Sequence, residues 1–245
     1  MNIRIAVNGY GSMGREVEKI AETEGCKLVE IFDIDQPARA ETQYDFDIVI
    51  DFTRPDAVVE NVELFSSMGK NIVLGTTGWY DKKDEIEKII KKQGNGLIWG
   101  SNFSIGMQML FRIVRKAAAL MDKVDGYDIM LHEMHHMRKK DSPSGSGISL
   151  ANIILDEVSR KKGIFSETAH EQINPNKLHL SSTRGGEIHG THTVYLDSLS
   201  DTIELTHRAK NRSGFAKGAL TAARWIKGKT GFYKFDDILD ELWQS

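Results

Sequence analysis

The residues best suited to chemistry are gathered in one stretch, His132–Gly147, near the middle of the chain. Its sixteen positions hold three histidines, three consecutive cations and a final Pro-Ser-Gly-Ser-Gly run. Imidazoles change protonation state near neutral pH, and the backbone N–H groups of a small-residue turn bind anions. The stretch therefore predicts an anion site beside titratable acids and bases.

Two other interpretations of this stretch are a metal site and a plain surface loop. His132, His135 and His136 are close enough in sequence to be metal ligands, but no cysteine or second cluster completes a tetrahedral set. The flanking cations would also repel a metal ion, so we expect no metal. A surface loop with helix-capping serines accounts for any one of these histidines, but it accounts poorly for the whole run.

A glycine motif near the N-terminus predicts a second site. Residues Gly9–Gly14 match G-x-G-x-x-G, between a β-branched run and an apolar helical stripe. Such glycines allow a tight turn, an approach to a pyrophosphate and close packing of helix on strand. Asp33 ends the next strand about 20 residues later, where a carboxylate binds ribose hydroxyls. This order predicts an NAD(P) site, whereas an ordinary glycine turn followed by a capping Asp is the plain alternative.

The elements around the glycine motif alternate between strand and helix. We expect strands at 27–32, 47–52, 71–74 and 97–99, with helices at 55–68 and 82–92. Small polar loops follow two of the strands, at 75–78 and 100–104. Ligands bind at the C-terminal ends of parallel strands, so these loops are predicted to border the nicotinamide. Plain turn chemistry would account for either loop on its own.

The second half of the chain differs from the first in composition, because all eight histidines lie between His132 and His207. We expect helices at 105–121, 145–161 and 215–227, and strands at 127–136, 178–183, 187–197 and 202–208 that form one mixed sheet. The terminal segment is expected to return to the first domain. The predicted fold class is α/β, with an N-terminal Rossmann dinucleotide-binding domain and a C-terminal mixed α/β substrate domain.

Composition narrows the class of protein. The net charge of −3 gives no indication of nucleic-acid binding. The single cysteine, Cys26, fits a reducing compartment. There is no signal-peptide core, and no apolar run approaches the ~18 residues that a membrane span requires. We therefore expect a soluble cytoplasmic protein with no membrane partner.

Together the two sites predict a reduction. A nicotinamide supplies hydride, so the substrate is an electrophile and the product must gain a proton. His135 and Lys139 are four residues apart and within reach of one small molecule. Arg138, Lys139 and the amides of 144–147 would hold carboxylates. The predicted substrate is small, anionic and unsaturated.

The motif His135-His136-x-x-Lys139-x-Asp141-x-Pro143-Ser144-Gly145-Ser146 resembles the signature of the 4-hydroxy-tetrahydrodipicolinate reductase (dihydrodipicolinate reductase) family. These NAD(P)H-dependent enzymes belong to the diaminopimelate route to lysine and form tetrahydrodipicolinate. The similarity covers nearly the whole chain and includes segments 52–55, 75–78, 102–106, 190–192 and 215–219.

The resemblance implies a role for each matching position. His135 matches a proton donor or acceptor, and Lys139 matches the lysine that protonates the product. Substrate binding falls to His136, Ser144, Gly145, Ser146 and Thr77. Cofactor binding falls to Gly9, Tyr10, Gly11, Ser12, Met13, Gly14, Asp33, Gly75, Thr76, Thr77, Gly100, Ser101, Asn102 and Phe103. Residues 1–104 with 216–245 would bind the dinucleotide, and residues 105–215 would bind substrate and assemble a homotetramer.

Three departures from the family pattern carry expectations. The glycine loop is one residue shorter and lacks a basic residue, and Ile34 stands where some members have a cation. Since Asp33 would also repel a 2′-phosphate, we expect NADH to be preferred over NADPH. Ser146 replaces a common threonine, but it keeps a hydroxyl and an N–H, so we expect substrate binding to survive.

Two alternative functions remain open at this point. An oxidoreductase of another small dicarboxylate would not need the loop at 143–145. A non-catalytic dinucleotide-binding regulator would not need His135 and Lys139.

Overall fold

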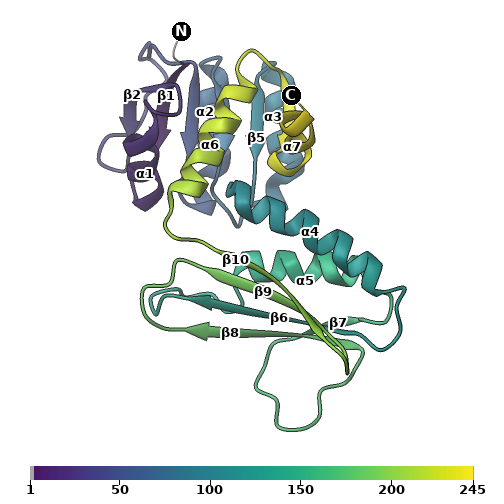
Figure 1. The fold of residues 1–245 in the computed structure, drawn as a ribbon. Helices are drawn as coiled ribbons and strands as arrows, with labels where there is room; N and C mark the ends of the chain where they lie inside the picture. Colours follow the sequence, from purple (N-terminus) through teal and green to yellow (C-terminus); the bar gives the residue numbers. More distant parts are fainter. Residues whose placement is uncertain (1–2, 245) are drawn as a thin grey trace. The chain divides into compact units, whose positions relative to one another are not determined.

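The computed structural model describes residues 3–244 and divides the chain into two compact units (Figure 1). The first unit comprises Met1–Ile105 and Arg212–Ser245, and the second comprises Gly106–Asn211. The first unit is therefore built from both ends of the chain. Within the described residues, no helix is long and apolar enough to cross a bilayer.

The first unit contains a six-stranded parallel sheet in the order β11-β5-β4-β3-β1-β2. Its strands are β1 (Ile3–Asn8), β2 (Cys26–Phe32), β3 (Ile48–Asp51), β4 (Asn71–Leu74), β5 (Gly96–Trp99) and β11 (Gly231–Lys234). The chain goes outward from β1 to β2 and then returns to β3 on the other side of β1. The strand order thus reverses between β1 and β3, which is where open α/β sheets bind ligands.

Helices cover both faces of this sheet, as its continuous apolar strands require. Buried side chains of α1 (Ser12–Ile20), α6 (Ser213–Ile226) and α7 (Phe235–Gln244) form one core with Ile5, Val7 and Ile50. On the other face, α2 (Val58–Ser67) and α3 (Lys83–Gln93) pack on Ala6, Val49 and Leu74. The predicted return of the chain's end is confirmed, because α6 and α7 complete this core and β11 extends the sheet.

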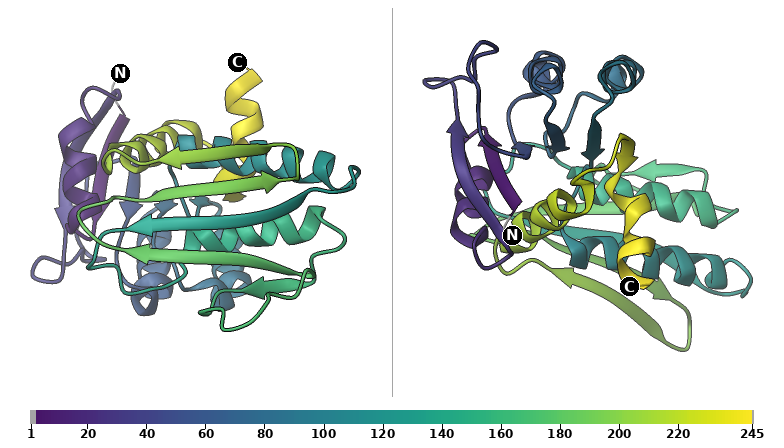
Figure 2. Two further views of the ribbon diagram at one scale, coloured as in Figure 1. Left: turned by 60° about the horizontal axis from the view of Figure 1, so that its bottom comes forward. Right: turned by 90° about the horizontal axis from the view of Figure 1, so that it is seen from above.

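The second unit contains one mixed sheet, as predicted. It has five strands, in the order β10-β9-β6-β8-β7. Its strands are β6 (Asp128–His135), β7 (Gly163–Phe165), β8 (Lys177–Arg184), β9 (Thr191–Asp197) and β10 (Thr202–Arg208). Strand β6 runs parallel to β8 and antiparallel to β9. Helices α4 (Ile105–Met121) and α5 (Gly145–Glu157) cover one face (Figure 2). Among the described residues of this unit, no helix covers the opposite face.

Several predicted boundaries were wrong. The strand expected at 187–197 begins only at Thr191, because Gly186 and Gly190 have φ of 54° and 146° and shape a turn before it. Helix α5 ends at Glu157 rather than near 161, since Val158 has the extended dihedrals φ −103° and ψ 98°. Strands β7 and β11 were not predicted, because three or four residues carry too little periodicity to be recognised.

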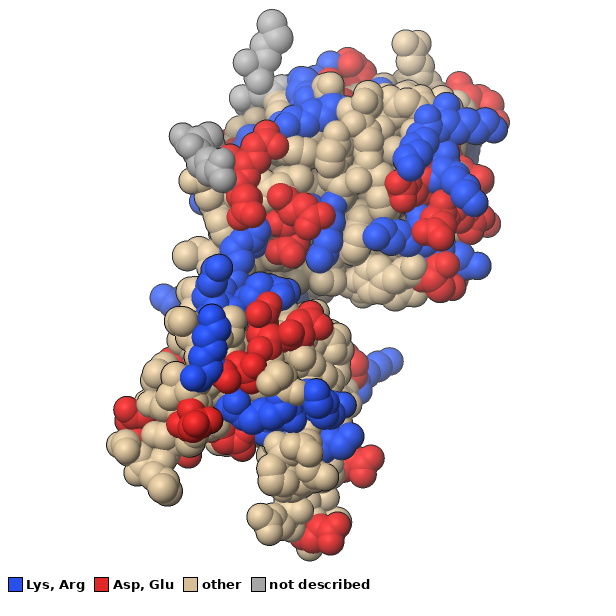
Figure 3. All heavy atoms as spheres, turned by 90° about the vertical axis from the view of Figure 1, so that its right-hand side faces the viewer, with Lys and Arg blue, Asp and Glu red and all other residues tan. Residues whose placement is uncertain are grey.

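Charged side chains of both signs are interspersed on the face drawn in Figure 3. This distribution agrees with the small net charge of −3. It resembles an ordinary solvated surface rather than the basic stripe of a nucleic-acid-binding protein.

Candidate active site

The glycine motif forms a tight loop between β1 and α1. Gly9 has φ +92°, and a Cβ there would lie 2.5 Å from the Phe52 carbonyl oxygen. A Cβ on Gly14 would lie 2.5 Å from the Gly9 carbonyl oxygen, so the first turn of α1 packs directly on the loop. A Cβ on Gly11 would meet nothing within 4 Å. The backbone at Gly11 is therefore open to a pyrophosphate at the start of α1.

A cavity of about 450 Å³ opens beside this loop, where β1, β2 and β3 end. Its lining includes Gly9, Gly11, Asp33, Thr53 and Arg54. Asp33 directly follows β2, and one of its carboxylate oxygens accepts from the Ile34 N–H at 2.9 Å. Open backbone and a carboxylate at one cavity suit the adenosine and pyrophosphate parts of a dinucleotide. The residues present therefore fit this cofactor.

Asp51, at the end of β3, forms hydrogen bonds with side chains at the ends of neighbouring strands, beside the predicted cofactor loops. The residue is only 2% exposed, and its side chain accepts hydrogen bonds from several segments. Asn8 and Asn61 donate to one oxygen at 2.8 and 2.9 Å, and the hydroxyls of Thr53 and Thr76 donate to the other at 2.7 and 2.9 Å. Because every partner donates, the buried carboxylate is satisfied without a cation. Sequence reasoning missed this role and treated Asp51 as the end of a strand.

The other predicted cofactor loops end neighbouring strands at the same edge of the sheet. A Cβ on Gly75 would lie 2.2 Å from the Phe52 ring, so the loop after β4 packs against the loop after β3. After β5, the Phe103 ring packs on Phe235 with centroids 4.6 Å apart, and the Phe103 backbone abuts Gly218 of α6. The remaining predicted positions on these loops and in the glycine turn are Tyr10, Ser12, Met13, Thr76, Thr77, Gly100, Ser101 and Asn102.

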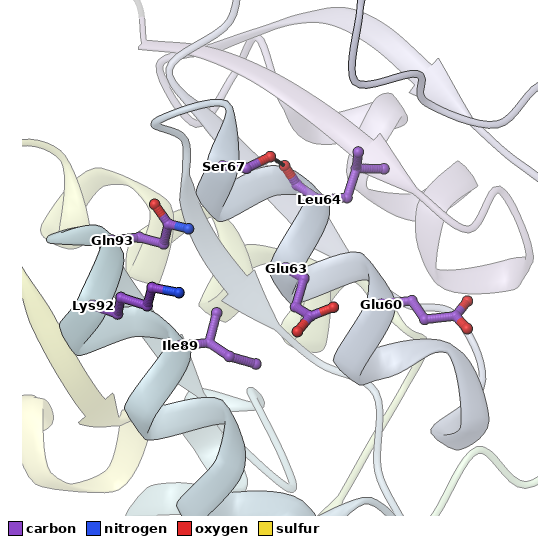
Figure 4. Close-up of a pocket in the computed structure, with 7 residues that line it drawn as sticks. All are labelled: Glu60, Glu63, Leu64, Ser67, Ile89, Lys92 and Gln93. Atoms are coloured by element: carbon purple, nitrogen blue, oxygen red, sulfur yellow. Dashed lines mark hydrogen bonds between the residues drawn. The ribbon is translucent and has the colours of Figure 1, made fainter.

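A second hollow of about 440 Å³ lies between α2 and α3, away from the strand ends (Figure 4). Its lining residues are Glu60, Glu63, Leu64, Ser67, Ile89, Lys92 and Gln93. Helical side chains of mixed charge surround it, and no predicted site residue lines it. We assign it no ligand.

In the second unit, His135 ends β6 and turns its side chain toward the helix-covered face. The ring is buried and packs edge-on against His192 at a centroid distance of 5.1 Å. Burial lowers the pKa of His135 to about 4; Glu133 opposes this shift, whereas the charges of His192, Lys139 and Arg184 add to it. His135 is therefore neutral at pH 7.

Lys139 lies in the turn that follows β6. Its backbone N–H donates to the His136 carbonyl at 3.1 Å, and its ammonium group pairs with Asp141 at 2.8 Å. Burial raises the pKa of Asp141, but the hydrogen bond and charge of Lys139 outweigh burial and lower it.

The Ser144–Gly147 turn begins α5, as predicted. The Ser144 hydroxyl caps the helix by accepting from the Gly147 N–H at 3.0 Å. A Cβ on Gly145 would meet nothing within 4 Å, so the space beside the helix N-terminus is open there, and the Gly145 N–H hydrogen-bonds the Asp141 carboxylate. Ser144 itself is 2% exposed, and its hydroxyl is occupied inside the protein. The Ser144 hydroxyl therefore holds the turn in place and is not available to a ligand.

The histidines of the opening stretch do not share one side of the sheet. His132 bonds to Ser181 at 2.8 Å on the face opposite His135. His136 lies just beyond the strand, and its backbone N–H donates to Ile188 at 2.7 Å. The structure therefore places only His135 on the helix-covered side of β6.

A different group, Glu133, His135 and His192, places possible ligand atoms within 4.8 Å of one another. Glu133 already accepts from Ser144 and from the Arg184 guanidinium, which supplies the positive charge that a metal would bring. We assign no metal here. Sequence reasoning named neither Glu133 nor His192 as a site residue, because their partners lie on other strands, far away in the sequence.

The parallel sheet with its glycine loop, and the histidine–lysine segment beside a helix N-terminus, define the class of dinucleotide-dependent oxidoreductases. Residues 3–103 match the family described as "Dihydrodipicolinate reductase, N-terminus", and residues 106–239 match its C-terminus. The chain belongs to the dihydrodipicolinate reductase family.

Individual relatives agree with this assignment over the full length. The chain is 37% identical to the 4-hydroxy-tetrahydrodipicolinate reductase of Christiangramia forsetii, over 99% of this chain and 100% of that one. It is 36% identical to that of Archaeoglobus fulgidus, over 97% and 100%. Among solved structures, the dipicolinate-bound dihydrodipicolinate reductase of Paenisporosarcina sp. TG-14 shares the fold, with a TM-score of 0.76 at 22% identity, over 97% of this chain and 100% of that one.

Proposed function

We propose that the chain catalyses the NAD(P)H-dependent reduction of 4-hydroxy-tetrahydrodipicolinate to tetrahydrodipicolinate, a step of lysine biosynthesis, with His135 and Lys139 at its centre. Full-length membership of the family supports the reaction. The assignment of residues rests on segment 135–147, which contains a buried histidine, a lysine and the N-terminus of a helix.

The first unit would hold the cofactor, which corresponds to the predicted domain 1–104 with 216–245. The loop Gly9–Gly14 would bind the pyrophosphate and Asp33 the ribose hydroxyls. The loops Gly75–Thr77 and Gly100–Phe103 would border the nicotinamide, which when bound supplies a hydride.

The second unit, the predicted domain 105–215, would hold the substrate and its proton donor. His135 is neutral at pH 7, so it accepts a proton or a hydrogen bond more readily than it gives one. Lys139, whose side chain pairs with Asp141 at 2.8 Å, would be the proton donor. The turn Gly145–Ser146, with His136, would hold the carboxylates, and Ser144 would fix this turn by capping the helix. The dipicolinate bound by the Paenisporosarcina enzyme is itself a dicarboxylate, which supports this ligand class.

The direct test couples the protein to the upstream synthase, which generates the cyclic substrate in place. Loss of NADH absorbance that requires both proteins is the expected result. Turnover of another small dicarboxylate with a higher kcat/KM would favour the rival oxidoreductase. Cofactor binding without turnover of any of these substrates would favour the non-catalytic regulator.

We predict that kcat/KM is higher with NADH than with NADPH, by about tenfold, which corresponds to one like-charge contact near the surface. Asp33 lines the adenosine cavity and would repel a 2′-phosphate, and its neighbour Ile34 brings no cation. Arg54 also lines the cavity, but it pairs with Asp56 at 3.4 Å.

Steady-state kinetics with both cofactors test this preference. Ile34→Arg should move the ratio toward NADPH, and Arg54→Gln shows whether the lining arginine contributes. A tenfold preference of the wild type for NADPH would contradict the prediction.

The assembly is proposed to be a homotetramer formed through the sheets of the second unit. The sheet face that carries His132 and Ser181 is not covered by a helix of this unit, which supports a subunit contact there. Sedimentation equilibrium should give a mass of four chains, and a monomer mass would contradict the proposal.

A further inference from the structure

Glu133 is a fully buried carboxylate in the middle of β6. Removing a carboxylate from water is costly unless hydrogen bonds and a cation compensate it. Burial raises the pKa of Glu133, but hydrogen bonds from His192, Ser144 and Arg184 outweigh burial and hold it far below its ordinary value. The side chain is therefore an anion. The groups that hydrogen-bond to it show which segments of the protein it positions.

One set of partners belongs to the turn that begins α5. The Ser144 N–H donates to one carboxylate oxygen at 2.9 Å, and the Ser144 hydroxyl donates to the other. The same hydroxyl accepts from the Gly147 N–H. A Cβ on Gly147 would lie 2.7 Å from the Glu133 carboxylate, so the first turn of the helix rests directly on this side chain.

A second partner, Arg184 of β8, extends the network to the segment that carries Lys139. Its terminal nitrogen donates to Glu133 at 2.8 Å and to the Asp141 backbone carbonyl at 2.7 Å. Asp141 pairs through its side chain with Lys139. Glu133 is thus linked to both ends of the loop between Lys139 and the helix.

The Ser182 hydroxyl donates at 3.0 Å to the oxygen that accepts from Arg184, and two buried imidazoles lie beside the other oxygen. His192 lies 3.5 Å and His135 3.9 Å from the same carboxylate oxygen. The first of these rings also lies 3.3 Å from the Ser144 hydroxyl. One carboxylate therefore contacts the turn, the arginine and both rings.

We propose that Glu133 is the positioning residue of this site, and that it aligns the carboxylate-binding turn of α5 with Lys139 and His135. It does so through Ser144 on one side and Arg184 on the other. This inference rests on the proposed function, because the turn matters only if it binds a substrate carboxylate. The role is distinct from that of a catalytic residue, since Glu133 is covered by these partners and does not face a ligand.

The test compares Glu133→Gln with Glu157→Gln. Both glutamates belong to the second unit and pair with an arginine, since Glu157 accepts from Arg115 at 2.7 Å, but Glu157 lies on the surface of α5. Glutamine keeps the size of the side chain and only one acceptor oxygen, so it cannot satisfy Arg184 and both Ser144 donors as the carboxylate does.

For Glu133→Gln we expect the affinity for dipicolinate, measured by calorimetry, to fall at least tenfold. KM for the cyclic substrate should rise similarly, while KM for NADH stays within twofold. Amide hydrogen exchange in 141–147 should become faster. Glu157→Gln should change none of these quantities. If the variant only contained less folded protein, kcat would fall, but KM for the cyclic substrate and KM for NADH would both stay as in the wild type.

Equal dipicolinate affinity and equal exchange in wild type and Glu133→Gln would overturn the inference. If Glu133→Gln does not fold, Arg184→Gln decides, because it keeps the Ser144 bonds and removes the guanidinium that links Glu133 to the Asp141 carbonyl. Unchanged dipicolinate affinity in that variant would overturn the inference. A wild type that neither binds dipicolinate nor turns over the substrate would instead overturn the proposed function, and the inference with it.

Discussion

Replacing Lys139 by alanine is expected to lower kcat by about two to three orders of magnitude, the range typical of losing a general acid. The ammonium group pairs with Asp141 at 2.8 Å, in the turn that directly follows His135. It lies in the second unit, so the affinity for NADH should stay within about twofold. Stopped-flow and steady-state assays with the coupled synthase measure the rate, and calorimetry measures cofactor binding.

Two further variants separate proton donation from charge. Lys139→Arg keeps the cation, but a guanidinium holds its proton too tightly to donate it. In this variant KM for the cyclic substrate should be close to that of the wild type, while kcat should be as low as in Lys139→Ala. Lys140→Ala is the matched control, because this neighbouring lysine is exposed. A kcat of Lys139→Ala within threefold of wild type would show that the proton comes from another group.

Replacing His135 by glutamine is expected to lower kcat by about a hundredfold, the lower end of general acid–base effects. Glutamine has a similar extent and hydrogen-bonding capacity but cannot take up a proton. Unchanged turnover in this variant would exclude His135 from proton chemistry.

The same variant should change how stability depends on pH. The pKa of His135 is lowered from 6.5 to about 4 in the folded protein, so between these values the unfolded chain binds a proton there and the folded chain does not. Stability is therefore lost as the pH falls through this window. The full difference corresponds to about 3 kcal/mol at 1.36 kcal/mol per pH unit.

Urea unfolding at pH 7.5 and pH 5.0 measures this effect. Between these two values, the free energy of unfolding of the wild type should fall by about 2 kcal/mol more than that of His135→Gln. His170→Gln, at an exposed histidine, should behave like the wild type. Parallel losses in wild type and His135→Gln would mean that the buried histidine titrates normally.

The sequence by itself determined the elements whose signals are local. The run Gly9–Gly14 between a strand and a helix predicted the tight turn. The structure shows why glycine is needed there, since a Cβ at Gly9 or Gly14 would collide with backbone. The apolar run 105–121 predicted α4 to the residue. The family motif at 135–146 then indicated the reaction, since proton donors and a helix N-terminus occur within one short segment.

Only the tertiary structure decided what surrounds those elements. Asp51 meets Asn8 across 43 positions, and Glu133 meets Arg184 across 51, so no local pattern marks either acid. The partners of each acid come from other strands and loops, which the sequence does not show to be close in space. The alternation of side chains along β6 and its end at His135 placed His132 on the other face.

The protonation state of the central histidine also came from the tertiary structure. In the sequence, the cluster His132–Gly147 indicated titratable groups near neutral pH. In the folded unit, burial lowers the pKa of His135 to about 4 although the nearby Glu133 carboxylate opposes the shift, so the ring is neutral at pH 7 and we propose Lys139 as the proton donor. Motifs depend on neighbours along the chain and can be predicted from sequence. A pKa depends on burial and on charges brought together by distant strands, so it required the fold.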